Sequence, residues 1–144
     1  MDSKLKNASA GRRGRVDLAC SVFNSKLIVT GGGEIYQSPS DTTVILDLSG
    51  GPGTYWVEGG RLHSARYGHA MMKLGLGGQE RLLVIGGSGW NSCDDHHVCV
   101  GNIDIVEVWN EESRSWEEER LLEGRKYMGA VAGTRGSVCL VWTK

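Results

Sequence analysis

A short stretch in the second half of the chain concentrates the side chains that most often bind metal ions. Its thiol, carboxylate and imidazole groups come from Cys93, Asp94, Asp95, His96, His97 and Cys99. Structural zinc sites use cysteine pairs separated by about two to four residues, together with a second pair of ligands. The Cys-x5-Cys spacing here is longer, and no second pair lies nearby in the sequence. We therefore expect an exposed polar loop with no bound metal or cofactor, and metal binding stays open as the alternative.

The sequence lacks the motifs of common catalytic sites. Residues 86–90, Gly-Gly-Ser-Gly-Trp, begin like the nucleophile elbow Gly-x-Ser-x-Gly of hydrolases, but Trp90 occupies the position of the last glycine. The phosphate-binding loop Gly-x4-Gly-Lys-Ser/Thr is also missing. His69 stands beside a run of small residues, where a buried and hydrogen-bonded histidine is more common than a catalytic one. We therefore expect a protein that is not an enzyme.

Charge and hydropathy exclude two classes of partner. The 16 Lys and Arg residues nearly balance the 17 Asp and Glu residues, and no long basic run marks a nucleic-acid site. No stretch approaches the ~20 consecutive apolar residues of a membrane helix, and the polar residues 1–11 lack the apolar core of a secretory signal. We expect residues 1–11 to be flexible, the protein to be cytoplasmic with its 4 cysteines reduced, and neither nucleic acid nor membrane to be bound.

Glycine departs most from average composition: the chain has 22 glycines in 144 residues, with only 2 prolines. Many of them stand as pairs between short apolar runs, where residues without a Cβ allow the backbone to turn tightly. Many tight turns imply many short strands. The composition therefore predicts an all-β fold.

An internal repeat organises these runs. In each of two units an apolar run ends in a glycine pair, and a second apolar run and a tryptophan follow. The recurring residues are Gly31-Gly32 and Trp56 in the first unit and Gly86-Gly87 and Trp116 in the second. Arg15, Arg66 and Arg125 begin three similar stretches, so a third unit starts before the sequence stops.

Each complete unit contains four short runs separated by turn-forming residues, which is typical of a four-stranded antiparallel sheet with tight connections. In the first unit we expect strands near residues 16–23, 27–31, 42–48 and 54–58. In the second we expect them near residues 68–74, 81–86, 103–109 and 115–119. The partial third unit retains strands near 128–132 and 137–142.

The second unit resembles the kelch repeat. In the family's order, it carries Gly86-Gly87, then Glu107-Val108-Trp109-Asn110, then Trp116. The likeness extends over residues 12–142. It departs from the family pattern at Trp109, where tyrosine is usual, and at Leu46, which replaces the aromatic residue in the first unit. In the third unit Trp142 stands where the glycine pair belongs.

The resemblance implies a β-propeller whose blades are four-stranded antiparallel sheets. The resemblance gives two groups of residues structural roles. The glycines form turns: Gly31, Gly32, Gly86 and Gly87. The tryptophans pack between blades: Trp56, Trp109 and Trp116. A closed ring needs about four to eight blades, whereas the chain supplies blades at about 12–60 and 61–120 and a partial blade at 121–144. We expect an incomplete propeller, either a fragment of a longer protein or a chain that self-associates to complete the ring.

The expected function is a non-catalytic interaction with another protein, as in kelch proteins that act as substrate adaptors. Strand direction places the second-to-third connections and the links between blades at one end of the sheets. The partner-binding residues expected on this loop face are Tyr36, Arg66, Tyr67, Trp90, Arg125 and Tyr127. Arginine and aromatic residues are frequent in binding hot spots, and a basic, aromatic rim favours an acidic peptide.

Two other functions stay open on the resemblance. Some kelch proteins bind actin filaments, so a cytoskeletal role is the first alternative. Others are copper oxidases of the galactose oxidase type, which hold the metal with tyrosine and histidine. The sequence shows no convincing set of these ligands, which disfavours the second alternative.

Overall fold

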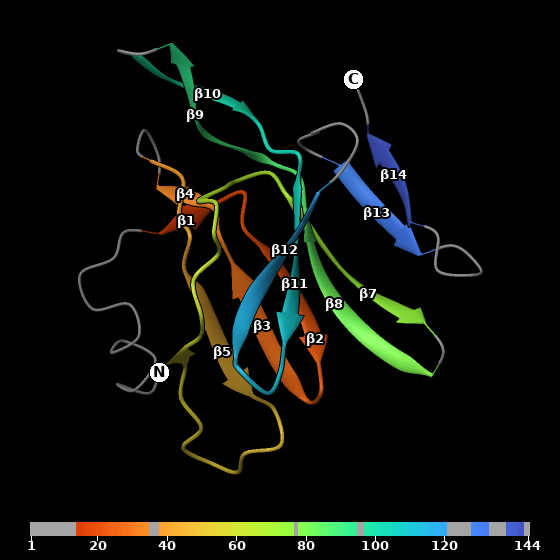
Figure 1. Ribbon diagram of the computed structural model, residues 1–144. Coiled ribbons are helices and arrows are strands. Elements are labelled where there is room, and N and C mark those ends of the chain that lie inside the picture. Colours follow the sequence, from red (N-terminus) through yellow and green to blue (C-terminus); the bar gives the residue numbers. More distant parts are fainter. Residues whose placement is uncertain are drawn as a thin grey trace.

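Every regular element in the described part of the chain is a β-strand (Figure 1). The computed structural model describes residues 14–34, 38–76, 78–94, 97–120, 128–132 and 138–142. Nothing in these ranges forms a helix with the length and apolarity to cross a bilayer. The prediction of an all-β fold is confirmed.

The first unit forms a four-stranded antiparallel sheet. Its strands are β2 (Ala19–Phe23), β3 (Lys26–Thr30), β5 (Thr43–Asp47) and β6 (Val57–Glu58). They lie in the order β2-β3-β5-β6, so each strand pairs with the next strand of the sheet along the chain. This is the meander that the spacing of turns predicts.

The second unit repeats this arrangement. Strands β7 (Ala70–Leu76), β8 (Gln79–Ile85), β11 (Ile105–Asn110) and β12 (Ser115–Arg120) pair in the order β7-β8-β11-β12, again antiparallel. The strands of both sheets lie within three residues of the predicted positions. The shorter third unit contains one antiparallel pair, which is formed by β13 (Met128–Ala132) and β14 (Val138–Trp142).

Two strand pairs were not expected. β9 (Ser88–Asp94) and β10 (His97–Asn102) form a hairpin in the connection between β8 and β11, where the sequence predicted a polar loop. β1 (Arg15–Val16) and β4 (Gly33–Glu34) form a shorter pair beside the first sheet. The prediction of a loop is therefore wrong for residues 88–94 and 97–102, because their backbones pair as strands. The side chains of residues 91–99 lie outside the described residues, so the predicted exposure is not tested.

The two glycine pairs adopt the same backbone conformation. Their φ angles are 60° and 84° at Gly31 and Gly32, and 61° and 94° at Gly86 and Gly87. Side chains rarely occupy this left-handed region. A Cβ at Gly87 would also lie 2.8 Å from the carbonyl oxygen of Tyr67. Glycine is therefore required both for the turn and for the close approach of the preceding link.

We expect the substitution Gly87→Ala to lower the free energy of unfolding by about 2 kcal/mol or more, because it adds left-handed strain to the steric contact. The measurement is urea denaturation followed by circular dichroism. Gly75→Ala is the matched control, since nothing lies within 4 Å of a Cβ at that strand position. An equal loss of stability in both variants would contradict the role of Gly87.

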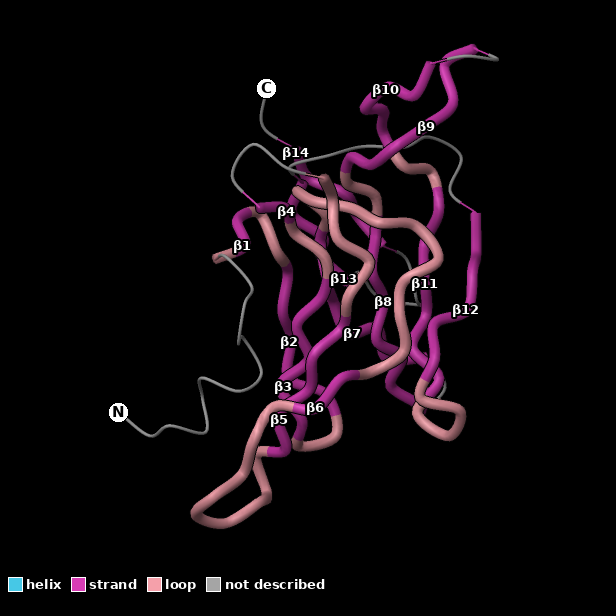
Figure 2. Tube along the Cα trace, turned by 90° about the vertical axis from the view of Figure 1, so that its left-hand side faces the viewer, coloured by secondary structure: helices cyan, strands magenta, loops and turns pink. Residues whose placement is uncertain are grey.

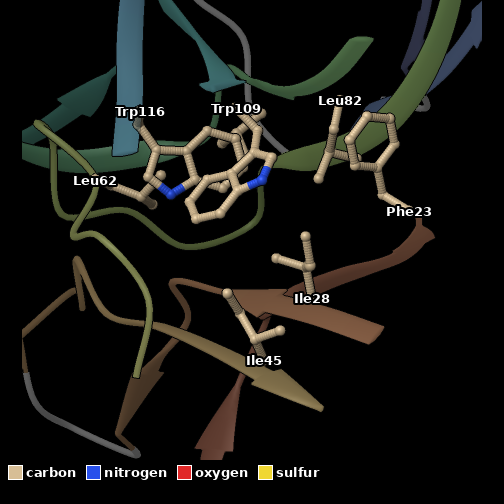
Figure 3. Close-up of a cluster of buried hydrophobic side chains, with 8 residues drawn as sticks. Phe23, Ile28, Ile45, Leu62, Leu82, Trp109 and Trp116 are labelled. Carbon is tan, nitrogen blue, oxygen red and sulfur yellow. The ribbon is translucent and has the colours of Figure 1, made fainter. Parts of the chain in front are cut away.

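The two four-stranded sheets pack face to face. The apolar cluster between them consists of Phe23, Ile28, Ile45, Leu62, Leu82, Val84, Trp109 and Trp116, and Figure 3 shows these side chains converging from both sheets. The opposite face of the second sheet is also buried, through Ala70, Met72, Leu74, Leu83, Ile85, Val106 and Val108. Burial on both faces explains why the strands of the second sheet are continuously apolar rather than alternating.

The tryptophans of the second sheet join it to the first. The ring centroids of Trp109 and Trp116 are 5.1 Å apart, and Trp116 Nε1 donates a hydrogen bond to Thr43 Oγ1 at 3.0 Å. Both tryptophans are buried, as core packing requires. Trp56 in the first unit is only half-buried.

The first strands of successive units lie next to one another. β2 neighbours β7, and β7 neighbours β13. The sheets are thus stacked with like edges together, and Figure 2 shows the stack with the β9–β10 hairpin projecting beyond one end. The connections at this end form the candidate site.

Candidate functional site

Three connections meet at one end of the stack: residues 31–42, 61–69 and 86–104, which we call the loop end. They are tied together through backbone hydrogen bonds. The amide of Gly32 donates to the carbonyl oxygen of Arg66 at 2.8 Å, and Tyr67 and Ser88 exchange two bonds of 2.9 Å. Antiparallel strands return their second-to-third connections to the same end, which is the arrangement that the sequence predicts.

The expectation that Arg66 is an exposed binding residue is wrong, because its side chain is 0% exposed. Arg66 Nη1 donates to the carbonyl oxygens of Gly86 at 3.0 Å and Ile105 at 2.9 Å. Its Nη2 donates to Glu107 Oε1 at 2.5 Å. The hydrogen bonds of the guanidinium therefore attach residues 61–69, which connect the two sheets, to the ends of strands β8 and β11.

The carboxylate of Glu107 also accepts hydrogen bonds from residues 63 and 64 of the same connection. Oε2 accepts from the backbone amide of His63 at 2.8 Å and lies 3.0 Å from its Nδ1, while Oε1 also accepts from the amide of Ser64 at 3.2 Å. Burial lowers the pKa of Arg66, and the charge and hydrogen bond of Glu107 oppose that shift. The guanidinium keeps its charge in the interior, where the Glu107 side chain lies beside it.

One sequence signal could have revealed this pair. Glu107 interrupts the run Ile105–Trp109, which is otherwise apolar on both faces. A carboxylate in such a strand is buried, and a buried charge needs a cation close by.

In the first unit, Arg15 makes hydrogen bonds similar to those of Arg66. Arg15 Nη1 donates to the carbonyl oxygen of Gly31 at 2.9 Å, just as Arg66 contacts Gly86. Arg15 also contacts the hydroxyl oxygens of Ser40 and Thr42, where the second unit has the Glu107 carboxylate. Arg15 and Arg66 thus each contact the first glycine of a glycine pair, and this explains their recurrence in the two complete units better than partner binding does.

His69 is buried, as expected, but only one of its ring nitrogens is paired. Nε2 lies 3.0 Å from Thr30 Oγ1, and Nδ1 has no partner among the described atoms. Burial and the charge of Arg66 lower the pKa of His69 to about 3. The imidazole is neutral at ordinary pH, and its 6% exposure leaves little access for a substrate.

Trp90 is the predicted site residue that reaches solvent most clearly. Its side chain is 49% exposed, and it lies directly opposite Val100, which is 47% exposed, across the β9–β10 hairpin. Residues directly opposite in an antiparallel pair share one face. The hairpin therefore exposes an apolar aromatic–aliphatic pair to solvent, and Figure 1 shows the hairpin itself extending beyond the four-stranded sheets.

The other predicted site residues are placed less completely. Tyr67 is half-buried, with its backbone bridged to Ser88. Tyr36, Arg125 and Tyr127 lie outside the described residues. Sequence reasoning missed Val100, although the alternating valines of residues 97–100 indicate a strand with one apolar face.

The expected basic rim is not seen in the described part of the loop end. Arg66 is buried against Glu107, and Arg61 Nη1 pairs with Asp41 Oδ1 at 2.7 Å. The described His, Cys, Asp and Glu residues include no group of three that could hold a metal ion. The side chains of residues 91–99 lie outside this statement, so the metal alternative at that cluster is untested.

No protein-family model and no curated protein matches the sequence. Among solved structures, the one titled "Structure of YjhT" superposes with a TM-score of 0.66 at 16% sequence identity. The match covers 88% of this chain and 34% of the YjhT chain, so this chain spans about a third of its length. At this identity the likeness concerns the fold.

Proposed function

We propose that the chain is part of a kelch-type β-propeller and that it acts as a non-catalytic protein-interaction module through the loop end. Two like sheets, stacked with their first strands adjacent, support the assignment of blades. The glycine pairs, and the hydrogen bonds that Arg15 and Arg66 make to them, recur in both units and support a kelch-type repeat. The chain matches about a third of the larger YjhT structure, which is consistent with its being part of a larger fold.

The observation that carries the interaction role is the exposed pair Trp90 and Val100 on the projecting hairpin. Exposing an indole to water forfeits the free energy gained by burying its large apolar surface. Tryptophan is also among the residues most enriched in binding hot spots, where it fills a pocket on the partner. Since the described cations of this end are matched by carboxylates, we infer a partner that offers an apolar groove rather than an acidic peptide.

We expect the substitution Trp90→Ala to weaken binding of the partner by about thirtyfold, equivalent to about 2 kcal/mol, because a central aromatic anchor is lost. Partners captured from cell extract with the wild-type chain would be identified by mass spectrometry, and their dissociation constants measured by titration calorimetry. The control is Tyr55→Ala, which removes a 62% exposed aromatic side chain in the β5–β6 connection at the opposite end.

The two variants must also unfold at the wild-type urea concentration, since both positions are exposed. Equal affinity of the wild-type chain and Trp90→Ala for every identified partner would reject the hairpin as the binding site. Loss of affinity in both variants would indicate a different surface.

A further inference from the structure

The two faces of the β9–β10 hairpin differ in chemistry. Trp90 and Val100 occupy paired positions and belong to its apolar face. Cys99 directly precedes Val100 in β10, so it belongs to the opposite face, because successive residues of a strand alternate. His97 shares that face with Cys99, and so does Asp94, the residue with which His97 is paired. We call the face of Asp94, His97 and Cys99 the polar face.

An irregularity in the pairing adds a second thiol to this group. The register shifts between His97 and Val98, so that Cys93 is an extra residue of β9 with no partner in the register. Such a bulge bends its strand, and bulges are frequent beside functional sites. The four residues around the shift come equally from the two strands: Cys93 and Asp94 from β9, His97 and Cys99 from β10.

The hairpin thus supplies the second pair of ligands that the linear sequence lacks. The Cys-x5-Cys spacing is longer than that of structural zinc sites when it is read along the chain. Across a hairpin, however, directly opposite Cβ atoms are about 4.5–5.5 Å apart, and alternate residues of one strand are about 7 Å apart. A tetrahedral zinc ion with metal–ligand bonds of about 2.0–2.3 Å can bridge such separations. Thiolate, imidazole and carboxylate groups are the ligands that zinc takes in proteins.

A bound ion would also stabilise the hairpin. Among the described strands, β9 and β10 form a two-stranded sheet of their own, and Figure 2 shows it projecting beyond the end of the stack. Outside this sheet, an isolated bridge joins Ser88 at its base to Tyr67. A two-stranded hairpin by itself is marginally stable in water. Metal binding contributes to folding directly, because the ligands come together only in the folded chain.

We propose that the β9–β10 hairpin binds one Zn²⁺ ion at the register shift. The ligands are the four residues around that shift: Cys93, Asp94, His97 and Cys99. The thiols bind as thiolates, so binding releases their protons to solvent. Four protein ligands complete the tetrahedral coordination of zinc, which is typical of a structural site. This site goes beyond the proposed function, which rests on the apolar face of the hairpin.

The test uses the reduced chain, freed of metal by a chelator, and Zn²⁺ alone as the probe. Competition with a fluorescent chelator should show one site per chain, and Co²⁺ should give the visible absorption bands of tetrahedral thiolate coordination. His97→Ala and Cys99→Ser should each raise the dissociation constant for Zn²⁺ at least about tenfold, the smallest loss expected even for an outer-shell partner. Cys20→Ser, which removes an exposed thiol of the first sheet, should leave it unchanged. Unfolding in urea verifies that the variants are folded.

The thiols themselves locate the ion. Zn²⁺ should slow the alkylation of Cys93 and Cys99, quantified by mass spectrometry, and should leave that of Cys20 unchanged. Trp90→Ala should bind Zn²⁺ as the wild-type chain does, which separates this test from that of partner binding. A chain without a Zn²⁺ site, or equal affinity for Zn²⁺ in the wild-type chain and Cys99→Ser, would overturn the proposal. Equal protection of Cys20 would overturn it too, since it would indicate binding without a specific site.

Discussion

The substitution Glu107→Ala is expected to lower the free energy of unfolding by about 3–5 kcal/mol, because it leaves the guanidinium of Arg66 buried without a counter-ion. Both side chains of this ion pair are 0% exposed. The carbonyl oxygens that remain around Arg66 can accept hydrogen bonds but carry no full charge. The two donors from residues 63 and 64 would lose their acceptor as well. Urea denaturation of the variant measures the loss.

An exposed ion pair of the same type provides the control. Arg81 Nη2 and Glu119 Oε1 are also 2.5 Å apart, but their side chains are 40% and 52% exposed. Glu119→Ala should cost well under the loss at Glu107, since exposed pairs contribute only about 0–1 kcal/mol. Replacing both buried partners, as in Arg66→Met with Glu107→Leu, should recover part of the stability. Equal losses at Glu107 and Glu119 would contradict the role assigned to burial.

The elements that the sequence predicts well are those set by local patterns. Apolar runs ending at Gly31 and Gly86 define β3 and β8, since glycine both ends the run and permits the left-handed turn. The hairpin β9–β10 was missed because it contains no continuous apolar run. Its polar residues outnumber the alternating apolar ones at 97–100, so the segment resembles a polar loop. A strand without a continuous apolar run lacks the signal that marks a buried strand.

The candidate site was harder to predict than the fold because exposure depends on distant residues. Arg66 and Trp90 both lie in connections, and both residue types are frequent in interfaces. Glu107, which is remote in sequence, pairs with Arg66 in the interior, whereas the side chain of Trp90 is 49% exposed. Composition and strand direction could locate the loop end, but they could not decide which of its side chains faces solvent.

The two tryptophans at equivalent positions test whether neighbouring sheets stabilise each other. Trp116→Ala is expected to cost about 3–5 kcal/mol, as for other buried aromatic residues, because it opens a cavity between the sheets. Trp116 is 2% exposed and reaches across to Thr43. Trp116→Phe should cost less, since it removes the hydrogen bond, worth about 1 kcal/mol, but retains most of the ring. The measurement is urea denaturation of each variant at a concentration that keeps the chain monomeric.

Trp56→Ala should cost far less than Trp116→Ala, although the two residues occupy the same place in their units. Trp116 should contribute more to stability because the first sheet packs over it. Trp56 is only half-buried. Equal costs for the two residues at low concentration would mean that each sheet is stabilised within itself. The repeat would then be a string of independent sheets rather than a stack whose faces are completed by their neighbours.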